Sequence, residues 1–386
     1  MAPDNAAPAA TAPTAAANPP TPEARQSLMP ELACYGLAGH SASPADLIDE
    51  AARAEQLGLG SILLSERFAL KDAGVMAGAA VAATSRIGVG TAATNHNTRH
   101  PLVTATFGAT MHALSRGRFA LGLGRGFDAL FDVMGLPRVT GAQMQDAIGI
   151  LRTLWRDESL VGHDGPAGTF PFLHQGAGLD GSIPILLVGI GPKTLELAGA
   201  IADGVVLHTF FTDETLERSV AAVRHGAERA GRDPSSVRIW SVLATVGDHL
   251  DPEVRLRKLV GRMATYLQGY GDILVEVNRW DPSTLQRFRE AAVIASARGA
   301  IDATATVAEL EQIMELIPDS WLAPAAVGSP TECAATVAAQ FDHGADSVIL
   351  HGATPAELEP IVEAYRTIRP PDTAQRCARN PGWFRS

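Results

Sequence analysis

The chain has 386 residues, of which 46% are hydrophobic and 19% are charged, and its formal net charge at pH 7 is −11. This composition is ordinary for a globular protein, and the acidic balance without a Lys/Arg-rich run disfavours nucleic acid as a partner. The longest apolar run, about 73–83, is shorter than the ~20 residues of a membrane-spanning helix, so no membrane segment is expected.

Residues 1–28 are rich in Ala, Pro and Thr and lack the pattern of a secretory signal, so we expect a disordered tail there. From residue 33 onward, short apolar runs alternate with segments of helical length, which is typical of a parallel sheet with crossover helices. Eight such units predict an α/β fold, a (β/α)8 TIM barrel. The predicted strands are 33–37, 61–64, 87–93, 119–123, 185–188, 205–208, 237–246 and 347–351.

Helix-start signals fall between these runs, because capping residues and prolines favour the first turn of a helix. They are Ser43 before Pro44, Pro101, Thr140 before a segment that runs to Trp155, Thr212, and Pro355 before a last helix that ends near Ile368.

Two insertions interrupt the alternation, and both are expected within one domain that spans 29–370. The first, about 157–181, is rich in Gly and Pro and is predicted to be a loop at the mouth of the barrel. The second, about 251–329, is mostly helical and contains Tyr266, Tyr270 and Trp280. It either covers the site or forms a subunit contact. Residues 371–386 are expected to be an irregular tail.

Reactive side chains follow the second and third predicted strands, at the end of a barrel where ligands bind. Glu66 and Arg67 follow the second strand, where they either contact a polar ligand or form a local ion pair. Asn95 and His96 follow the third. His96 is a candidate for proton transfer near neutral pH, and the alternative is a histidine that only satisfies its loop.

Glycines follow the fourth predicted strand. Gly122, Gly124 and Gly126 allow the backbone to approach a flat ligand closely, and Arg125 between them is placed to pair with an anion. A dinucleotide-binding fingerprint needs a further glycine and an acidic residue about 20 positions on. Both are missing, which disfavours a Rossmann site.

The fifth predicted strand runs into Gly189, Ile190, Gly191, Pro192 and Lys193, which open a helix. Free N–H groups and the helix dipole favour a phosphate at such a start, and the lysine adds positive charge. The alternative is a plain strand-to-helix turn.

His208 ends the sixth predicted strand and is either a ligand-facing group or a hydrogen-bonded core histidine. The cysteines are Cys34, Cys333 and Cys377. They are too far apart for a zinc ribbon or a redox pair, so no metal site is expected and a reducing cytoplasm fits best.

Several strings together resemble the bacterial luciferase-like flavin and deazaflavin oxidoreductases over about residues 31–369. They are GRFA followed by LGLGRG, TRHP at a helix start, GIGPKTLELAG, and ADGVV. The TNxxTRHP, GRFxLGLG and GPKTLELAG strings are most similar to the coenzyme F420-dependent branch, which includes glucose-6-phosphate dehydrogenases and methylene-tetrahydromethanopterin reductases.

The resemblance implies a cofactor site and a homodimer. A bulge around Thr91 and Ala92 would back the deazaflavin ring, at a place where this family often has a non-prolyl cis peptide, and Asn95 would lie beside the ring. Gly191, Pro192 and Lys193 would hold the cofactor phosphate, and His208 would approach the cofactor chain.

The departures from the family pattern bear on the chemistry. The sugar-phosphate dehydrogenases have an Asp-His pair where this chain has Glu66 and Arg67, and an acidic glutamate where it has Phe127. Their mechanism is therefore disfavoured here. Arginine is not a general base at neutral pH, but it can hold an anionic substrate or stabilise developing negative charge.

The sequence thus predicts an oxidoreductase that transfers a hydride between coenzyme F420 and a small organic substrate, with His96 or Glu66 handling protons. The alternatives are an FMN-dependent monooxygenase on the same barrel and a flavin- or deazaflavin-binding protein without turnover. In every case Glu66, His96, Arg125 and Lys193 are expected around one cavity at the rim.

Overall fold

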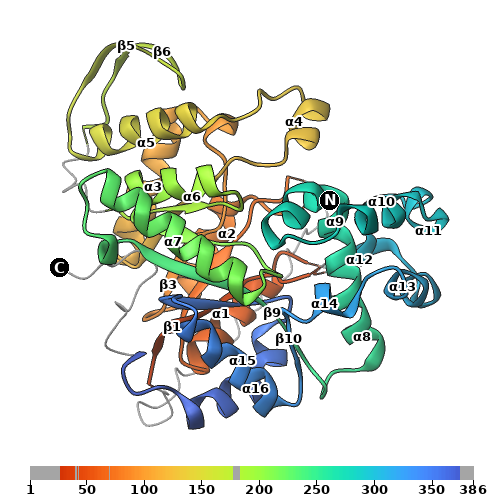
Figure 1. The fold of residues 1–386 in the computed structure, drawn as a ribbon. Coiled ribbons are helices and arrows are strands. Elements are labelled where there is room, and N and C mark those ends of the chain that lie inside the picture. The colour runs from red at the N-terminus through yellow and green to blue at the C-terminus, as the bar shows by residue number, and fades with distance from the viewer. Residues whose placement is uncertain (1–26, 40, 42, 69, 177–182, 374–386) are drawn as a thin grey trace, which may run out of the picture.

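The computed structural model describes residues 27–39, 41, 43–68, 70–176 and 183–373. Eight parallel strands form a closed barrel in the order β9-β11-β1-β2-β3-β4-β7-β8, and β8 pairs back with β9 (Figure 1). The prediction of a (β/α)8 barrel is confirmed. The barrel strands are β1 Met29–Tyr35, β2 Leu59–Leu64, β3 Gly88–Thr91, β4 Phe119–Gly124, β7 Ile185–Val188, β8 Gly204–Val206, β9 Arg238–Gly247 and β11 Ser347–His351.

Most of the predicted tail 1–28 lies outside the described residues, as does the predicted tail 371–386 beyond residue 373. A short strand, β10 (Ala326–Gly328), pairs with the end of β9 outside the barrel.

Small and large side chains share the interior of the barrel. Ala33 of β1, Ala120 of β4 and Ala92, which directly follows β3, share one buried cluster with Trp240 of β9. The small residues leave the volume that the indole fills, as close packing of an interior requires. A larger apolar cluster lies between the strands and the surrounding helices.

The barrel helices follow the strands as predicted. They are α1 Asp46–Gln56, α2 Ala73–Ala83, α3 Pro101–Ser115, α4 Asp128–Met134, α5 Gly141–Trp155, α6 Pro192–Ile201, α7 Asp213–Arg229, α15 Pro330–Asp342 and α16 Pro355–Ile368, with short helical turns η2 His96–Thr98 and η3 Pro234–Ser236.

The helix starts confirm the capping signals with one exception. The side chain of Thr140 accepts a hydrogen bond at the start of α5, and that of Thr212 does so at the start of α7. The Ser43 side chain does accept from the Ala45 N–H at 3.1 Å, but it does so in the turn that precedes the helix, because α1 begins at Asp46 with Ala45 as its N-cap.

The first insertion is a β-hairpin and not the loop that was predicted. Strands β5 (Leu160–Gly165) and β6 (Gly168–Leu173) pair antiparallel, and the hairpin projects beyond α5 (Figure 1). Gly168 has a φ of +139°, a backbone conformation that favours glycine at the turn. The glycines that indicated a loop therefore permit the tight turn of a hairpin.

The second insertion is helical, as predicted, and lies on one side of the barrel (Figure 1). It comprises α8 Pro252–Leu256, a π-helical turn η4 Arg257–Gly261, α9 Arg262–Asn278, α10 Pro282–Glu290, α11 Ala292–Ala295, α12 Ile301–Thr304, α13 Val307–Met314 and α14 Asp319–Leu322. Trp280 stacks on Trp321 within this insertion, with ring centroids 4.7 Å apart.

Candidate active site

All the predicted site residues lie at the same end of the barrel, because its strands are parallel. They follow five strands that are consecutive in the sheet, from β2 to β8. This carboxyl end is where (β/α)8 enzymes place their catalytic residues. The four residues expected around one cavity do not all line the same pocket. Arg125 and Lys193 line a pocket at this end of the barrel, and Glu66 and His96 are not among its lining residues.

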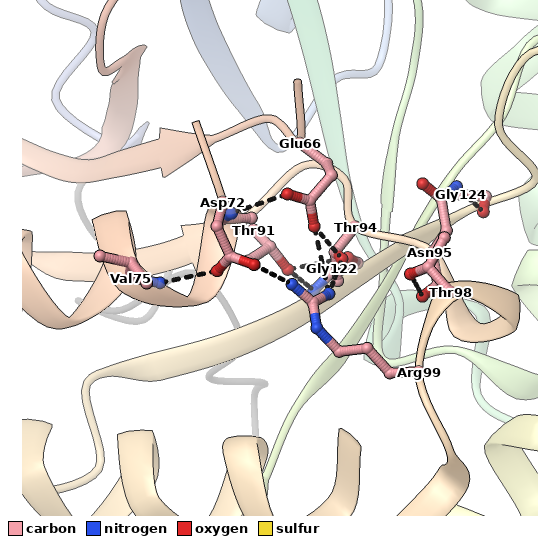
Figure 2. A network of polar contacts seen from close by, with 11 residues as sticks. Glu66, Asp72, Val75, Thr91, Thr94, Asn95, Thr98, Arg99, Gly122 and Gly124 are labelled. Atoms are coloured by element: carbon pink, nitrogen blue, oxygen red, sulfur yellow. Dashed lines mark hydrogen bonds and ion pairs between the residues drawn. The ribbon is translucent and has the colours of Figure 1, made fainter. Parts of the chain in front are cut away.

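Glu66 is the centre of a polar network beside β3. Its carboxylate accepts hydrogen bonds from the Ala73 N–H at 2.9 Å, the Thr94 hydroxyl at 2.7 Å and the Arg99 guanidinium at 3.1 Å (Figure 2). Arg99 also pairs with Asp72 at 2.6 Å. Three donors therefore engage a carboxylate that is only 5% exposed.

The network holds the segment that follows β3 against its neighbours. The Glu66 N–H donates to the carbonyl of Ala93, and the peptide bond between Ala92 and Ala93 is cis. On the other side, the Thr94 N–H donates to the Gly122 carbonyl. The bond that the family resemblance places near Thr91 and Ala92 is thus found one residue later.

Gly122 and Gly124 give this segment room. A Cβ added at Gly122 would overlap the carbonyl oxygen of Thr91, and one added at Gly124 would lie 3.1 Å from the Cβ of Ala93. The Asn95 amide donates to the Gly124 carbonyl at 3.0 Å (Figure 2). The glycines predicted to approach a ligand therefore also admit the backbone of the β3 segment.

His96 is partly buried in the turn η2. Burial lowers its pKa below the ordinary value, with Asp146 acting weakly in the opposite direction. Its Nε2 atom is buried and has no hydrogen-bond partner among the described residues. A neutral ring with one nitrogen that makes no hydrogen bond to a described residue is chemically able to donate or accept a proton.

Arg67 does not form the ion pair with Glu66 that was the alternative to a ligand contact. Its guanidinium donates to the carbonyl of Gly39 at 2.7 Å, while Glu66 pairs with Arg99. Burial and the positive charge of Arg262 lower the pKa of Arg67. Two guanidinium groups therefore lie near one another at this end of the barrel.

A pocket of about 260 Å³ lies at the end of β7, beside α5 and α6, and its apolar wall includes Met144, Leu187 and Leu197. Arg125 and Lys193 line it, together with Gly141 and Thr194 from the first turns of α5 and α6. Two cationic side chains and two helix N-termini thus meet at one pocket, which is a favourable environment for a phosphate. Gly191, the N-cap of α6, makes no side-chain cap.

A series of aromatic rings crosses the carboxyl end of the barrel, and neighbouring centroids lie 4.7 to 6.1 Å apart. The rings are Phe127 after β4, Tyr270 of α9, His208 after β8, Tyr266 of α9, His351 of β11 and Tyr35 of β1, in that order. All six are partly buried, so each keeps some exposed surface.

The histidines in this series are uncharged at neutral pH. Burial lowers the pKa of His208 to about 4. Burial and the charge of Arg262 lower the pKa of His351 well below its ordinary value. Burial raises the pKa of Tyr270 to about 12, so this phenol stays protonated.

Sequence reasoning missed Tyr35, Arg262 and His351. Tyr35 and His351 end the first and eighth strands, which is the signal that identified the other candidates. Arg262 precedes Tyr266 and Tyr270 at intervals of four residues, a spacing that places all three on one face of α9.

Two classes of feature are absent from the residues that the structure describes. No group of three or more His, Cys, Asp or Glu side chains is arranged to hold a metal ion. None of the helices in those ranges combines the length and apolar character needed to span a bilayer.

A family model described as luciferase-like monooxygenase matches residues 24–347. Among curated proteins, the chain is 30% identical to the 5,10-methylenetetrahydromethanopterin reductase of Methanolobus tindarius over 236 residues, 60% of this chain and 70% of the reductase. It is also 31% identical to the phthiodiolone/phenolphthiodiolone dimycocerosates ketoreductase of Mycobacterium tuberculosis, over 46% of this chain and 49% of the ketoreductase.

Solved structures show the same fold at lower identity. The coenzyme F420-dependent tetrahydromethanopterin reductase from Methanopyrus kandleri superposes with a TM-score of 0.72 at 20% identity, covering 88% of this chain and 99% of the reductase. An F420-dependent secondary alcohol dehydrogenase gives 0.66 at 20% identity, over 88% and 99% of the two chains. The monooxygenase RslO1 from Streptomyces bottropensis gives 0.59 at 18%, over 87% and 98%.

Proposed function

The chain belongs to the luciferase-like monooxygenase family, and from this we propose that it is a coenzyme F420-dependent oxidoreductase that transfers a hydride between the deazaflavin and a small organic substrate. The observation that carries the proposal is the cationic pocket of Arg125 and Lys193, adjacent in the sheet to the β3 segment that contacts Glu66 and Arg99 through Thr94. Similarity to two methylenetetrahydromethanopterin reductases at 30% identity supports the choice of coenzyme.

The residues present fit the coenzyme. Its phosphate would be held by Lys193, Arg125 and the N–H groups at the start of α6, after Gly189, Ile190, Gly191 and Pro192. Its ring would lie near Thr91, Ala92, Asn95 and Gly124, and His208 would approach its chain. When bound, the deazaflavin supplies a carbon that carries the hydride.

Glu66 is better suited to positioning than to proton transfer in this proposal. Its carboxylate already accepts three hydrogen bonds, one of them from the paired Arg99, which leaves it little capacity to bind substrate. Its contacts fix the β3 segment on which the ring would rest. His96 stays a candidate for proton transfer because its Nε2 atom makes no hydrogen bond among the described residues.

A titration with oxidised coenzyme F420, followed by its absorbance and fluorescence, tests the coenzyme. We expect saturable binding, and Lys193→Ala should weaken it about tenfold because one charge-assisted contact to phosphate is lost. Arg229→Ala, at an arginine that is 70% exposed on α7, is the matched control and should bind like the wild type.

A parallel titration with FMN tests the alternative. A structure of a type II Baeyer-Villiger monooxygenase with FMN superposes on this chain with a TM-score of 0.60 at 17% identity. Tight binding of FMN without binding of coenzyme F420 would replace the proposal by a flavin-dependent oxygenase, and binding of neither would refute both.

We also propose that the protein is a homodimer formed through α2 and α3. These two neighbouring helices contain no Asp, Glu, Lys or Arg, in a chain that is 19% charged. They nevertheless expose Val75, Val103 and Leu114 by 65%, 55% and 62%. A surface of this kind is typical of a contact between subunits.

A further inference from the structure

A group of polar side chains lies at the carboxyl ends of β1, β2 and β11, on the opposite side of the barrel mouth from the phosphate pocket. The hydroxyl of Tyr266 lies 3.0 Å from Nε2 of His351, and Tyr35 contacts the ring of His351 edge-on. The Arg262 guanidinium is 5.7 Å from the centre of the Tyr266 ring. The proposed coenzyme contacts use none of these four residues.

Positively charged side chains outnumber negatively charged ones around the Tyr266 hydroxyl. Arg262 pairs with Asp302 at 2.7 Å, and both are nearly buried. Arg67 also acts on Tyr266 and His351, and the only hydrogen bond of its guanidinium to a described residue is to the carbonyl of Gly39.

Lys71 is a further cationic neighbour of Arg67, and the carboxylate of Glu50 acts on Lys71. Lys71 donates to the carbonyl of Gly36, and Glu50 accepts from the Leu37 N–H. Three cationic side chains thus share two carboxylates. A ligand with one negative charge would neutralise the remaining positive charge beside Arg67.

We propose that Arg67, Arg262, Tyr266 and His351 form the substrate site, and that the substrate is a small carbonyl compound that carries a carboxylate group. Arg67 would bind the carboxylate, because the planar guanidinium matches it through two parallel hydrogen bonds. Tyr266 would be the proton donor to the carbonyl oxygen. This inference rests on the proposed function, since it assigns the second ligand of the same barrel mouth.

The reduction balances with the groups named. When bound, the reduced deazaflavin would supply a hydride to the carbonyl carbon and would be left oxidised, while the π electrons of the C=O bond would move to the oxygen. The O–H bond of Tyr266 breaks and its proton bonds to that oxygen, which gives the alcohol. The phenolate that remains is stabilised by Nε2–H of His351 and by Arg262, and it recovers a proton from water.

The environment suits a proton donor. Burial raises the pKa of Tyr266, against the opposite effect of Arg262 and Arg67, so the phenol is protonated at neutral pH. His351 is uncharged, and its Nδ1 atom has no partner among the described residues. A neutral imidazole with hydrogen on Nε2 leaves the phenol hydrogen free to point at substrate.

Binding of charged and neutral probes tests the recognition of a carboxylate. Calorimetric titrations of the coenzyme-loaded protein would compare benzoate with benzamide, which has nearly the same shape without the charge. We expect benzoate to bind about tenfold more tightly or better, and Arg67→Met to abolish this preference while Arg67→Lys restores part of it. Arg229→Met is the control and should keep the preference.

Turnover tests the proton donor. With phenylglyoxylate as substrate, Tyr266→Phe should lower kcat about 100-fold or more, because general acid catalysis contributes about this factor. The Kd of benzoate should change less than about threefold, since the ring stays in place. Arg229→Met is again the control and should keep the kcat of the wild type, and His96→Gln tests the other candidate for proton transfer.

The results separate this inference from the proposed function. Failure of coenzyme F420 to bind refutes the proposed function, whereas coenzyme binding with equal affinity for benzoate and benzamide refutes the carboxylate site. Tighter binding of phenylphosphonate than of benzoate would overturn the class of substrate. Full activity of Tyr266→Phe with loss of activity in His96→Gln would overturn the assignment of the proton donor.

Discussion

Gly122 shows how one residue shapes the candidate site. It lies in β4, where its backbone exchanges hydrogen bonds with the Thr91 hydroxyl and accepts another from the Thr94 N–H. Because Gly122 has no side chain, the β3 segment can lie within hydrogen-bonding distance of its backbone (Figure 2). The sequence pattern placed a glycine at the mouth, but it did not say whether ligand or backbone would need the space.

Gly122→Ala should lower the free energy of unfolding by about 3 kcal/mol or more, because the new methyl group overlaps backbone atoms of Thr91 that have no free direction to move. Urea unfolding measures the change. Gly149→Ala is the control, at an exposed glycine in the interior of α5 with no atom within 4 Å of an added Cβ. It should stabilise the protein by about 0.5–1 kcal/mol. Equal effects of the two substitutions would contradict the steric argument.

His208 links the site to pH. Its pKa is about 4 in the folded protein, below the ordinary value of 6.5. The unfolded chain therefore binds more protons between these two values, and stability falls as the pH drops through this range. The histidine's contribution is fully present above the unfolded pKa and is lost progressively towards the folded one.

Between roughly pH 7 and pH 5, the free energy of unfolding should fall by about 2 kcal/mol more in the wild type than in His208→Gln, which cannot titrate. Urea unfolding at both pH values gives the difference, in which the other titrating groups cancel. Parallel slopes for the two proteins would show that His208 has its ordinary pKa in the folded state.

At the scale of elements, the sequence predicted what depends on neighbouring residues and missed what depends on distant ones. The apolar runs predicted all eight strands of the barrel, and β7 and β11 at their observed bounds. Glu66 was placed at the mouth, but its partner Arg99 is 33 positions away in sequence. Only the pairing of β2 with β3 brings these two residues together.

The insertions show the same distinction. The helical spacing of Arg262, Tyr266 and Tyr270 is visible in the sequence. Which strands this face contacts depends on the path of α9 over the barrel. No local sequence pattern determines that path. The hairpin β5–β6 was missed because its glycines indicate turns of many kinds, and because its contacts with Asp146 of α5 join residues that are 17 and 21 positions apart.

Asp146 of α5 is the principal polar anchor of the hairpin. Its carboxylate accepts from the Ala167 N–H at 2.9 Å and lies 3.0 Å from Nε2 of His163. A two-stranded hairpin is marginally stable on its own. Asp146→Ala should therefore expose the hairpin without unfolding the barrel.

Limited proteolysis with chymotrypsin checks this expectation, because the bond after Phe172 is a cleavage site and Phe172 is 61% exposed. Asp146→Ala should be cut there about tenfold faster than the wild type at an unchanged Tm, as expected for local opening. Gln145→Ala, at the exposed neighbour on the same helix, should be cut like the wild type. A fall in Tm that parallels the cleavage would instead make the hairpin part of the cooperative core.

At the scale of the whole molecule, the distribution of charge separates two surfaces. The carboxyl end of the barrel gathers Arg67, Arg125, Lys193 and Arg262, although the chain as a whole has a net charge of −11. The helices α2 and α3 carry no Asp, Glu, Lys or Arg. A local excess of positive charge on an acidic protein attracts anionic ligands to the carboxyl end of the barrel. The uncharged helices α2 and α3, by contrast, favour contact with another apolar surface.

The proposed homodimer leads to a prediction about mass in solution. Light scattering should give twice the chain mass for the wild type, and Val75→Glu or Val103→Glu should give the monomer, because a contact with a two-fold axis buries each new carboxylate in both subunits. Val133→Glu introduces the same charge on α4, at a valine that is 86% exposed, and should remain dimeric. If Val133→Glu alone dissociates the protein, the contact lies at α4. A wild-type protein that is monomeric at every concentration would show that α2 and α3 face solvent, and their apolar composition would then need another explanation, such as a partner of different sequence.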